Sequence, residues 1–175
     1  MNKPETFQIK RVVLIGYRGA GKTTVGKRLA EILAWTYLST DEMIVKKSGA
    51  SITSFVEKYG WKEFRNLEHE VVHQLKAENE SVIDCGGGVV EDARNMTVLK
   101  HRALVVWMDA PLEIIKSRLS HVVDRPPLSE ADLISDLEEH YQRRLSFYQK
   151  YSDMQLNSSE KTVEEICQKI ISRLS

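Results

Sequence analysis

The sequence predicts an α/β fold in which helices cover both faces of a parallel β-sheet. Short apolar runs typical of buried strands occur at residues 12–15, 37–38, 81–85, 103–108 and, more weakly, 154–156. Helix-like stretches separate these runs, and such alternation is characteristic of a parallel sheet. A glycine-rich segment also joins the first run to an amphipathic stretch, as in a strand–loop–helix unit.

The helix-like stretches are recognised by apolar residues at helical spacing, such as Val25, Leu29 and Leu33. Ser129 and Asp132 resemble a capping box, so we expect a long charged helix to begin beside them. The predicted helices span residues 22–33, 53–59, 61–77, 93–99, 112–119, 130–150 and 163–174.

Length and composition predict a single domain over residues 1–175, with its core in residues 9–175. The chain has 175 residues, of which 42% are hydrophobic. A chain of this size removes about 70% of its unfolded surface from water, so its core needs no disulfide or metal. No internal repeat, low-complexity tract or long linker divides the sequence.

The charge balance argues against nucleic-acid and membrane partners. Lys and Arg together number 25, as do Asp and Glu, so no broad basic field exists to attract polyanions. No apolar run approaches the ~18 residues of a membrane span.

Cys85 and Cys167 lack metal-site spacing and are predicted to be reduced core residues, which indicates a cytoplasmic protein.

The glycine-rich segment fits the pattern G-x-x-x-x-G-K-T of a phosphate-binding loop. Residues 16–24 read GYRGAGKTT. The glycines let successive backbone N–H groups point at a phosphate, and the following helix adds the positive end of its dipole. Lys22 would reach the outer phosphates and Thr23 would ligate Mg²⁺.

Polar or glycine residues follow each of the first four apolar runs. In an open parallel sheet, ligands bind beyond the carboxyl ends of the strands, so these residues should converge on one crevice. Asp41 is a candidate to orient a hydroxyl group and accept its proton, although an aspartate there also suits a helix N-cap. The residues concerned, besides the phosphate loop, are Ser39, Thr40, Asp41, Gly86, Gly87, Gly88 and Asp109.

Arg65 and Glu68 lie one helical turn apart, so they can pair and fix the direction of the guanidinium. A fixed guanidinium suits a planar carboxylate, whereas a plain surface ion pair is the alternative. The triple glycine at 86–88 would let backbone N–H groups approach a ligand closely, or would form a flexible turn.

The second half of the chain contains four arginines that could meet anionic ligands: Arg118, Arg125, Arg143 and Arg144. Tandem prolines follow Arg125 in a polar stretch between two helices, which predicts a short lid at about residues 120–128. Arg143 and Arg144 are about 100° apart on a helix, so we expect only Arg144 to face the ligand.

Two other kinds of protein compete with this interpretation. The sequence HEVVH at residues 69–73 matches a zinc-protease pattern, and Glu91 could supply a third ligand. The same helix, however, carries Arg65 and Glu68, and nothing else indicates a peptide cleft.

A nucleotide-dependent switch would use the same phosphate-binding loop, but its usual base motif and switch segments are absent from the sequence.

Taken together, these motifs resemble the shikimate kinase family over nearly the whole chain, from about residue 9. The resemblance implies a three-layer P-loop kinase fold, similar to nucleoside monophosphate kinases, with strand order 2-3-1-4-5. It also implies ATP-dependent phosphorylation of the 3-hydroxyl of shikimate, in aromatic amino-acid biosynthesis, with Mg²⁺ as cofactor. We expect a monomer; a sister enzyme such as a gluconate kinase would share loop and fold, but not Phe-Arg-x-x-Glu with a triple glycine.

The resemblance also implies site residues, with substrate-binding helices at about residues 41–77. Lys22, Asp41 and Arg125 would be catalytic. Thr23, and Ser39 through water, would hold Mg²⁺. ATP would contact Gly19, Ala20, Gly21, Lys22, Thr23, Thr24, Arg118 and Arg125. Shikimate would contact Asp41, Phe64, Arg65, Gly86, Gly87, Gly88 and Arg144.

The chain departs from the family at three places. The family commonly has Asp-x-Asp after the second strand, whereas this chain has Ser39 in the first position, from which we expect weaker Mg²⁺ affinity. Trp61 replaces a usual glutamate, and Asp84 with Cys85 replaces small or hydroxyl residues. For Asp84 we consider a place beside Mg²⁺, but favour a salt bridge or a capping role.

Overall fold

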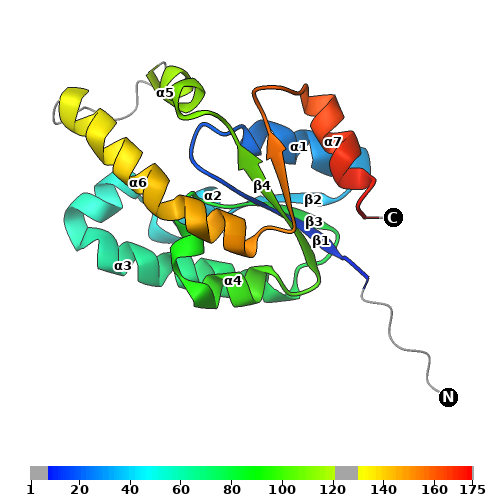
Figure 1. The fold of residues 1–175 in the computed structure, drawn as a ribbon. Helices are drawn as coiled ribbons and strands as arrows, with labels where there is room; N and C mark the ends of the chain where they lie inside the picture. The colour runs from blue at the N-terminus through cyan, green and yellow to red at the C-terminus, as the bar shows by residue number, and fades with distance from the viewer. Residues whose placement is uncertain (1–7, 121–129, 175) are drawn as a thin grey trace.

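The computed structural model describes residues 8–120 and 130–174 and confirms the predicted sheet (Figure 1). Its five strands are all parallel, in the order β2-β3-β1-β4-β5. The apolar runs predicted the strands to within one residue at each end. The strands are β1 (Arg11–Ile15), β2 (Thr36–Ser39), β3 (Ser81–Asp84), β4 (Ala103–Asp109) and β5 (Met154–Asn157).

Most helices lie close to the predicted spans, but α2 was missing from the predicted helices and α7 ends at Ile171 instead of residue 174. Gly60 has φ 81° and ψ 166° inside α3, and this non-helical residue separates the two helices predicted at 53–59 and 61–77. Ser129, the predicted cap of α6, lies outside the described residues. The helices are α1 (Lys22–Leu33), α2 (Thr40–Ser48), α3 (Ile52–Gln74), α4 (Ala93–Leu99), α5 (Leu112–Ser120), α6 (Glu130–Tyr151) and α7 (Val163–Ile171), with short 3₁₀ turns η1 (Leu75–Ala77) and η2 (Val89–Glu91).

Both faces of the sheet are buried, as strands with continuous apolar sequence require. Side chains alternate between the faces of a strand. In β1, Val12 and Leu14 pack against α1 and α7, whereas Val13 and Ile15 pack against α3, α4 and α6 (Figure 1). Both cysteines are buried and unpaired in these two cores, as predicted. No helix of the described residues is long and apolar enough to span a bilayer.

A buried arginine stands at the start of the central strand, where an apolar residue would be usual. The side chain of Arg11 is 1% exposed. Its guanidinium donates hydrogen bonds to the carbonyl oxygens of Leu75 (2.7 Å), His101 (2.9 Å) and Val98 (2.5 Å). Leu75 caps the end of α3, and Val98 and His101 lie in and just after the end of α4, so Arg11 joins β1 to the helix layer beside it. The local sequence pattern gave no indication of this role.

The carboxyl ends of β1, β2 and β3 are within one residue of one another, and this edge positions the site. In the sheet register, Asp84 at the end of β3 lies between Leu14 of β1 and Ser39 of β2. The loop to α1, the start of α2 and the glycine turn after β3 therefore begin side by side, as the rule for open parallel sheets predicts.

Candidate active site

The loop between β1 and α1 forms an open cradle of backbone N–H groups. Gly21 is the N-cap of α1 and has φ 87°, a left-handed conformation that favours glycine. No side chain caps this helix, in contrast to α2, α3, α4 and α7. Because the first N–H groups of a helix lack intrahelical partners, this end of α1 suits a phosphate.

Lys22 lies inside the cradle. Its Nζ donates hydrogen bonds to the carbonyl oxygens of Gly16 (2.9 Å) and Tyr17 (3.0 Å). Burial lowers the pKa of Lys22, while the carboxylates of Asp84 and Asp41 oppose that shift. The ammonium group is thus held by the same loop whose N–H groups would grip phosphate.

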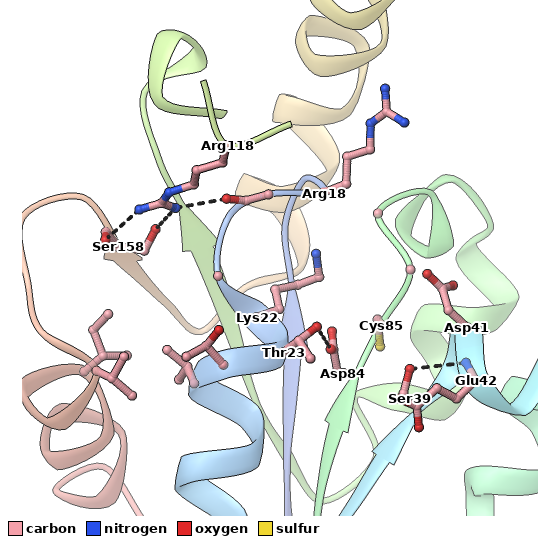
Figure 2. A pocket seen from close by; sticks show the side chains of 18 of the residues that line it. Arg18, Lys22, Thr23, Ser39, Asp41, Glu42, Asp84, Cys85, Arg118 and Ser158 are labelled. Carbon is pink, nitrogen blue, oxygen red and sulfur yellow. Dashed lines mark hydrogen bonds between the residues drawn. The ribbon is translucent and has the colours of Figure 1, made fainter. Parts of the chain in front are cut away.

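A cavity of about 710 Å³ opens over this loop. Its walls include Ser39, Asp84 and Arg118, which come from three different strand or helix ends (Figure 2). Arg118 Nη1 donates to the carbonyl oxygen of Gly19 (2.9 Å) and to Ser158 Oγ (3.0 Å). Of the ATP residues expected from the resemblance, the cavity gathers Gly19, Gly21, Lys22, Thr23, Thr24 and Arg118.

Two expected residues do not line this cavity, and a third lies outside the described residues. Ala20 is fully buried in the core beneath the loop. Arg125 and the lid predicted at about 120–128 fall, apart from Ser120 at the end of α5, outside the described residues. Asp109 lines neither this cavity nor the second cavity described below. Its carboxylate instead accepts hydrogen bonds from Ala110 N (2.9 Å) and Gln155 Nε2 (2.9 Å) beside β5.

The sequence reasoning missed Ser158 and Lys161, which line the same cavity from the loop after β5. The signal was available. The rule that ligands bind beyond strand ends, which selected the residues after the first four strands, applies equally to the fifth.

A second cavity, of about 530 Å³, lies beside the first and is rich in guanidinium groups. It holds all seven residues that the resemblance assigned to shikimate: Asp41, Phe64, Arg65, Gly86, Gly87, Gly88 and Arg144. Trp61, Glu91 and Arg143 also line it, and they were not among those expected. Residues from α2, α3, α6 and the glycine turn thus meet in one place.

Arg65 is held in a fixed direction by a buried partner. Its Nη1 donates to both carboxylate oxygens of Glu68, at 2.9 and 2.8 Å. Glu68 is 1% exposed, so the alternative of a surface ion pair is wrong. Burial raises the pKa of Glu68, and the charge of Arg65 opposes that rise. The guanidinium also lies over the rings of Phe64 (5.2 Å) and Trp61 (5.6 Å).

Both arginines of the pair in α6 reach the cavity, which corrects the expectation that only one would. Arg144 Nε donates to Glu91 Oε1 (2.6 Å), and Arg143 Nη2 donates to Glu91 Oε2 (2.9 Å). Arginine side chains are long enough that two of them at adjacent helical positions can both reach the same carboxylate. Arg144 is the more buried of the two, with 14% of its side chain exposed against 47% for Arg143.

The two cavities meet at Asp41. This residue lines both, together with Arg18, Gly86 and Gly87. A Cβ atom at Gly86 would lie 2.5 Å from Asp41 Oδ1, so the carboxylate lies directly on the glycine turn. Asp41 is not the N-cap of α2: that role belongs to Ser39, whose Oγ accepts a hydrogen bond from Glu42 N (3.3 Å).

Asp84 also differs from expectation. It neither caps a helix nor forms a salt bridge with a described residue. Instead its Oδ2 accepts a hydrogen bond from Thr23 Oγ1, at 2.6 Å (Figure 2). It also accepts one from Tyr37 OH, at 2.9 Å. The sequence could not show these contacts, because Thr23 and Asp84 belong to different strand–loop units.

The zinc-protease pattern does not assemble a metal site. His69 Nδ1 is hydrogen-bonded to Asn95 Oδ1 (2.8 Å), and Glu91 is engaged by the guanidinium groups of α6. Within the part of the chain that the structure describes, no three His, Cys, Asp or Glu residues are grouped as metal ligands.

The fold and the two cavities define a P-loop kinase of the kind that phosphorylates a small molecule. The parallel sheet carries the phosphate-loop motif at its carboxyl edge, and a separate cavity lined by arginines opens next to it. A family model described as shikimate kinase matches residues 18–175. The chain belongs to the shikimate kinase family.

Similar proteins support this membership at the level of whole chains. A shikimate kinase of Caldanaerobacter subterraneus is 34% identical over 93% of this chain and 95% of its own length. One from Geobacter sulfurreducens is 36% identical over 92% and 88%. The structure of the Acinetobacter baumannii shikimate kinase in complex with shikimate has a TM-score of 0.87, at 31% identity over 95% and 93% of the two chains.

The similarity to a gluconokinase of Sinorhizobium meliloti is more distant. Its structure covers 95% of this chain and 93% of its own with a TM-score of 0.59, but only 13% of residues are identical. That level of identity shows a shared fold and nothing about substrate. The alternative of a gluconate kinase is therefore not favoured.

Proposed function

We propose that this chain transfers the γ-phosphoryl group of ATP to the 3-hydroxyl of shikimate. The observation that supports this most directly is the position of Asp41, which lines both the phosphate-loop cavity and the guanidinium-rich cavity. A carboxylate at that junction is where a hydroxyl group on one ligand would meet a phosphate on the other. The 3-hydroxyl itself is taken from the family resemblance.

Asp41 would orient the attacking hydroxyl and accept its proton. The substrate oxygen forms a bond to the γ-phosphorus while the bond to the bridging oxygen of ADP breaks, and the hydroxyl proton passes to the carboxylate. General-base catalysis typically contributes about 10²–10⁴ in rate. Asp41→Asn should therefore lower kcat by about that factor with little change in the Kd of ADP. A near-normal kcat would refute the role.

The protein contributes mainly position and charge, because phosphoryl transfer needs little covalent chemistry from the enzyme. Lys22 and the N–H groups of the loop would bind the phosphates, and Arg118 would lie beside them. An arginine on the transferring group is worth about 10³–10⁵ in rate. We propose Arg125 for that place on the sequence alone, since it lies outside the described residues.

The second cavity would hold shikimate through its carboxylate. Arg65 and Arg144 offer guanidinium groups that are already oriented, by Glu68 and by Glu91. A planar, fixed guanidinium binds a carboxylate with good geometry and low entropic cost. The glycine turn would add N–H groups close to the substrate ring, because its residues lack a Cβ atom.

Magnesium fits the oxygen groups of the first cavity. The hydroxyls of Thr23 and Ser39 line it, next to the carboxylate of Asp84. Hard cations such as Mg²⁺ prefer oxygen ligands and retain several waters. We propose that Thr23 would ligate the ion and that Ser39 would contact one of its waters. The ion, when bound to ATP, offsets charge that develops on the phosphate oxygens.

The decisive experiment measures ADP release by the purified protein with ATP and Mg²⁺ in three parallel reactions. One contains shikimate, one gluconate and one no acceptor. We expect turnover with shikimate and only background in the other two. Turnover with gluconate would support the sister kinase, and equal rates in all three would indicate a nucleotide hydrolase or switch.

A further inference from the structure

We propose that Asp84 is a positioning residue for Mg²⁺, and that it supplies from β3 the carboxylate that Ser39 lacks on β2. This inference rests on the proposed function, because it concerns the metal that accompanies ATP. Asp84 is the last residue of β3 and is 6% exposed at the floor of the phosphate-loop cavity.

The hydrogen bond between Thr23 and Asp84 has only one possible direction while the carboxylate is ionised. An ionised carboxylate accepts but cannot donate, so the Thr23 hydroxyl must give its proton to Asp84 Oδ2, over 2.6 Å. The lone pairs of Thr23 Oγ1 are then turned away from Asp84. The Thr23 hydroxyl oxygen therefore has its lone pairs available to ligate a cation.

Tyr37 strengthens the same arrangement. Its hydroxyl also donates to Asp84 Oδ2, at 2.9 Å. The two hydroxyl groups fix the carboxylate, and both bonds use the same oxygen. Among the described residues, no hydrogen bond to Asp84 Oδ1 is formed and no Lys or Arg lies within ion-pair distance of Asp84, although the charge of Lys22 acts on it from farther away. A nearly buried carboxylate is costly unless a cation balances it, and a cation bound in the cavity would add to the partial compensation that Lys22 gives.

The sheet register explains why a carboxylate on β3 can serve in place of one on β2. Ser39 and Asp84 are direct partners in the parallel pairing of these two strands. Both end their strands at the carboxyl edge, and both line the same cavity (Figure 2). P-loop proteins generally hold Mg²⁺ with the loop Ser or Thr and a nearby Asp, and Asp84 contacts Thr23 directly.

The test measures metal affinity, not only activity. Mn²⁺ is titrated into the protein saturated with ADP, and free Mn²⁺ is followed by electron paramagnetic resonance. Asp84→Asn keeps the size of the side chain and an oxygen acceptor for Thr23, but removes the charge. Loss of such an outer-shell partner typically lowers metal affinity about 10–100-fold, and we expect a weakening in that range.

Two measurements separate a role at the metal from a merely structural one. The Kd of ADP in EDTA should be unchanged in Asp84→Asn, because no metal is then involved. Asp109→Asn is the matched control: it makes the same change at the end of β4, away from both cavities, and should leave Mn²⁺ affinity at the wild-type value.

A second variant tests the exchange between strands. Ser39→Asp combined with Asp84→Asn moves the carboxylate to the paired position on β2 without changing net charge. An aspartate at 39 still suits the N-cap of α2, so the helix should keep its start. We expect this double variant to recover most of the lost Mn²⁺ affinity, and no recovery would overturn the equivalence of the two positions.

Unchanged Mn²⁺ affinity in Asp84→Asn, or an equal loss of ADP affinity in EDTA, would overturn the proposal. These outcomes are independent of the acceptor assay. A wild-type protein that bound Mn²⁺ and ADP as described but failed to phosphorylate shikimate would refute the proposed function and leave the role of Asp84 standing.

Discussion

Arg65 lies so close to the glycine turn that Gly88 has no room for a side chain. A Cβ atom built at Gly88 would lie 2.7 Å from Arg65 Nη1 and 2.8 Å from its Cζ. The obstacle is the end of a flexible side chain, so a larger residue at 88 would displace the guanidinium without disturbing the backbone. The fold therefore tolerates the change, whereas the cavity does not.

Gly88→Ala should weaken shikimate binding and spare ATP, because only the position of Arg65 changes. Arg65→Ala removes the guanidinium altogether, and we expect it to weaken shikimate binding by at least about 2 kcal/mol, since hydrogen bonds to charged groups are worth about 1.5–3 kcal/mol. The loss of binding free energy in Gly88→Ala should not exceed the loss in Arg65→Ala. Binding of each ligand can be measured by calorimetry. An equal loss of both ligands in either variant would contradict the assignment of Arg65 to the substrate.

Gly87→Ala is the matched comparison for this prediction. A Cβ atom there would meet the carbonyl oxygen of Gly16 at 3.4 Å and would not approach Arg65. The backbone N–H of the turn is retained in both variants. We therefore expect a smaller loss of shikimate affinity in Gly87→Ala than in Gly88→Ala.

At the scale of elements, Arg11 holds together the edge of the sheet opposite the site. One guanidinium donates to three carbonyl oxygens, at the ends of α3 and α4. The carbonyls of Leu75 and Val98 also accept backbone N–H groups, from Glu78 (3.2 Å) and His101 (3.4 Å), so Arg11 adds a second, charged donor to each of them. The strand that carries the phosphate loop is thus tied to the helices that support the second cavity.

Arg11→Ala should lower the free energy of unfolding by about 3–5 kcal/mol, because it removes three hydrogen bonds from a charged donor, each worth about 1.5–3 kcal/mol, and water replaces only a part of them. Arg11→Lys should recover some stability but not all, since an ammonium cannot match the planar fork. Urea unfolding followed by circular dichroism measures both.

The comparison for Arg11 is Arg28→Ala, which removes an exposed arginine with surface ion pairs on α1. Exposed pairs contribute little. A loss in Arg11→Ala no larger than in Arg28→Ala would show that the buried guanidinium does not join the elements as described.

At the scale of the whole molecule, the charges of the second cavity link stability to pH. Glu91 from η2 contacts Arg143 and Arg144 of α6 and lies 3.8 Å from Arg65 of α3. Burial alone would raise the pKa of Glu91, but Arg144 and the two other arginines outweigh it. The pKa in the folded protein is therefore below its ordinary value of 4.5.

A carboxyl group with a lowered pKa stabilises the folded state above its unfolded pKa, and this contribution disappears as the pH falls through the folded pKa. Glu91→Gln should therefore be less stable than the wild type at pH 7. The difference should persist down to about pH 5 and shrink below about pH 4.5. Urea unfolding at several pH values measures it.

Glu57→Gln provides the control, because Glu57 is exposed on α3 and forms no ion pair with a described residue. Its difference from the wild type should be small throughout this pH range. If the difference for Glu91→Gln were the same at pH 7 and pH 4, the arginines would not be the cause of its contribution.

Local patterns in the sequence determined the fold class, the strand ends and the phosphate loop. Alternating apolar runs reveal a parallel sheet because both faces of its strands are buried, and the loop motif spans only nine neighbouring residues, 16–24. Arg65 and Glu68 were also paired correctly, since one helical turn brings them together whatever the tertiary structure.

Tertiary structure alone decided which distant groups share a site. Asp84 was expected to form a salt bridge or a cap, yet it binds Thr23, 61 positions away in the sequence. Glu91 contacts arginines 52 and 53 positions away, and the carbonyls bound by Arg11 lie 64 or more positions from it. Contacts between segments far apart in the chain depend on sheet order and register, and no local spacing of residues encodes them.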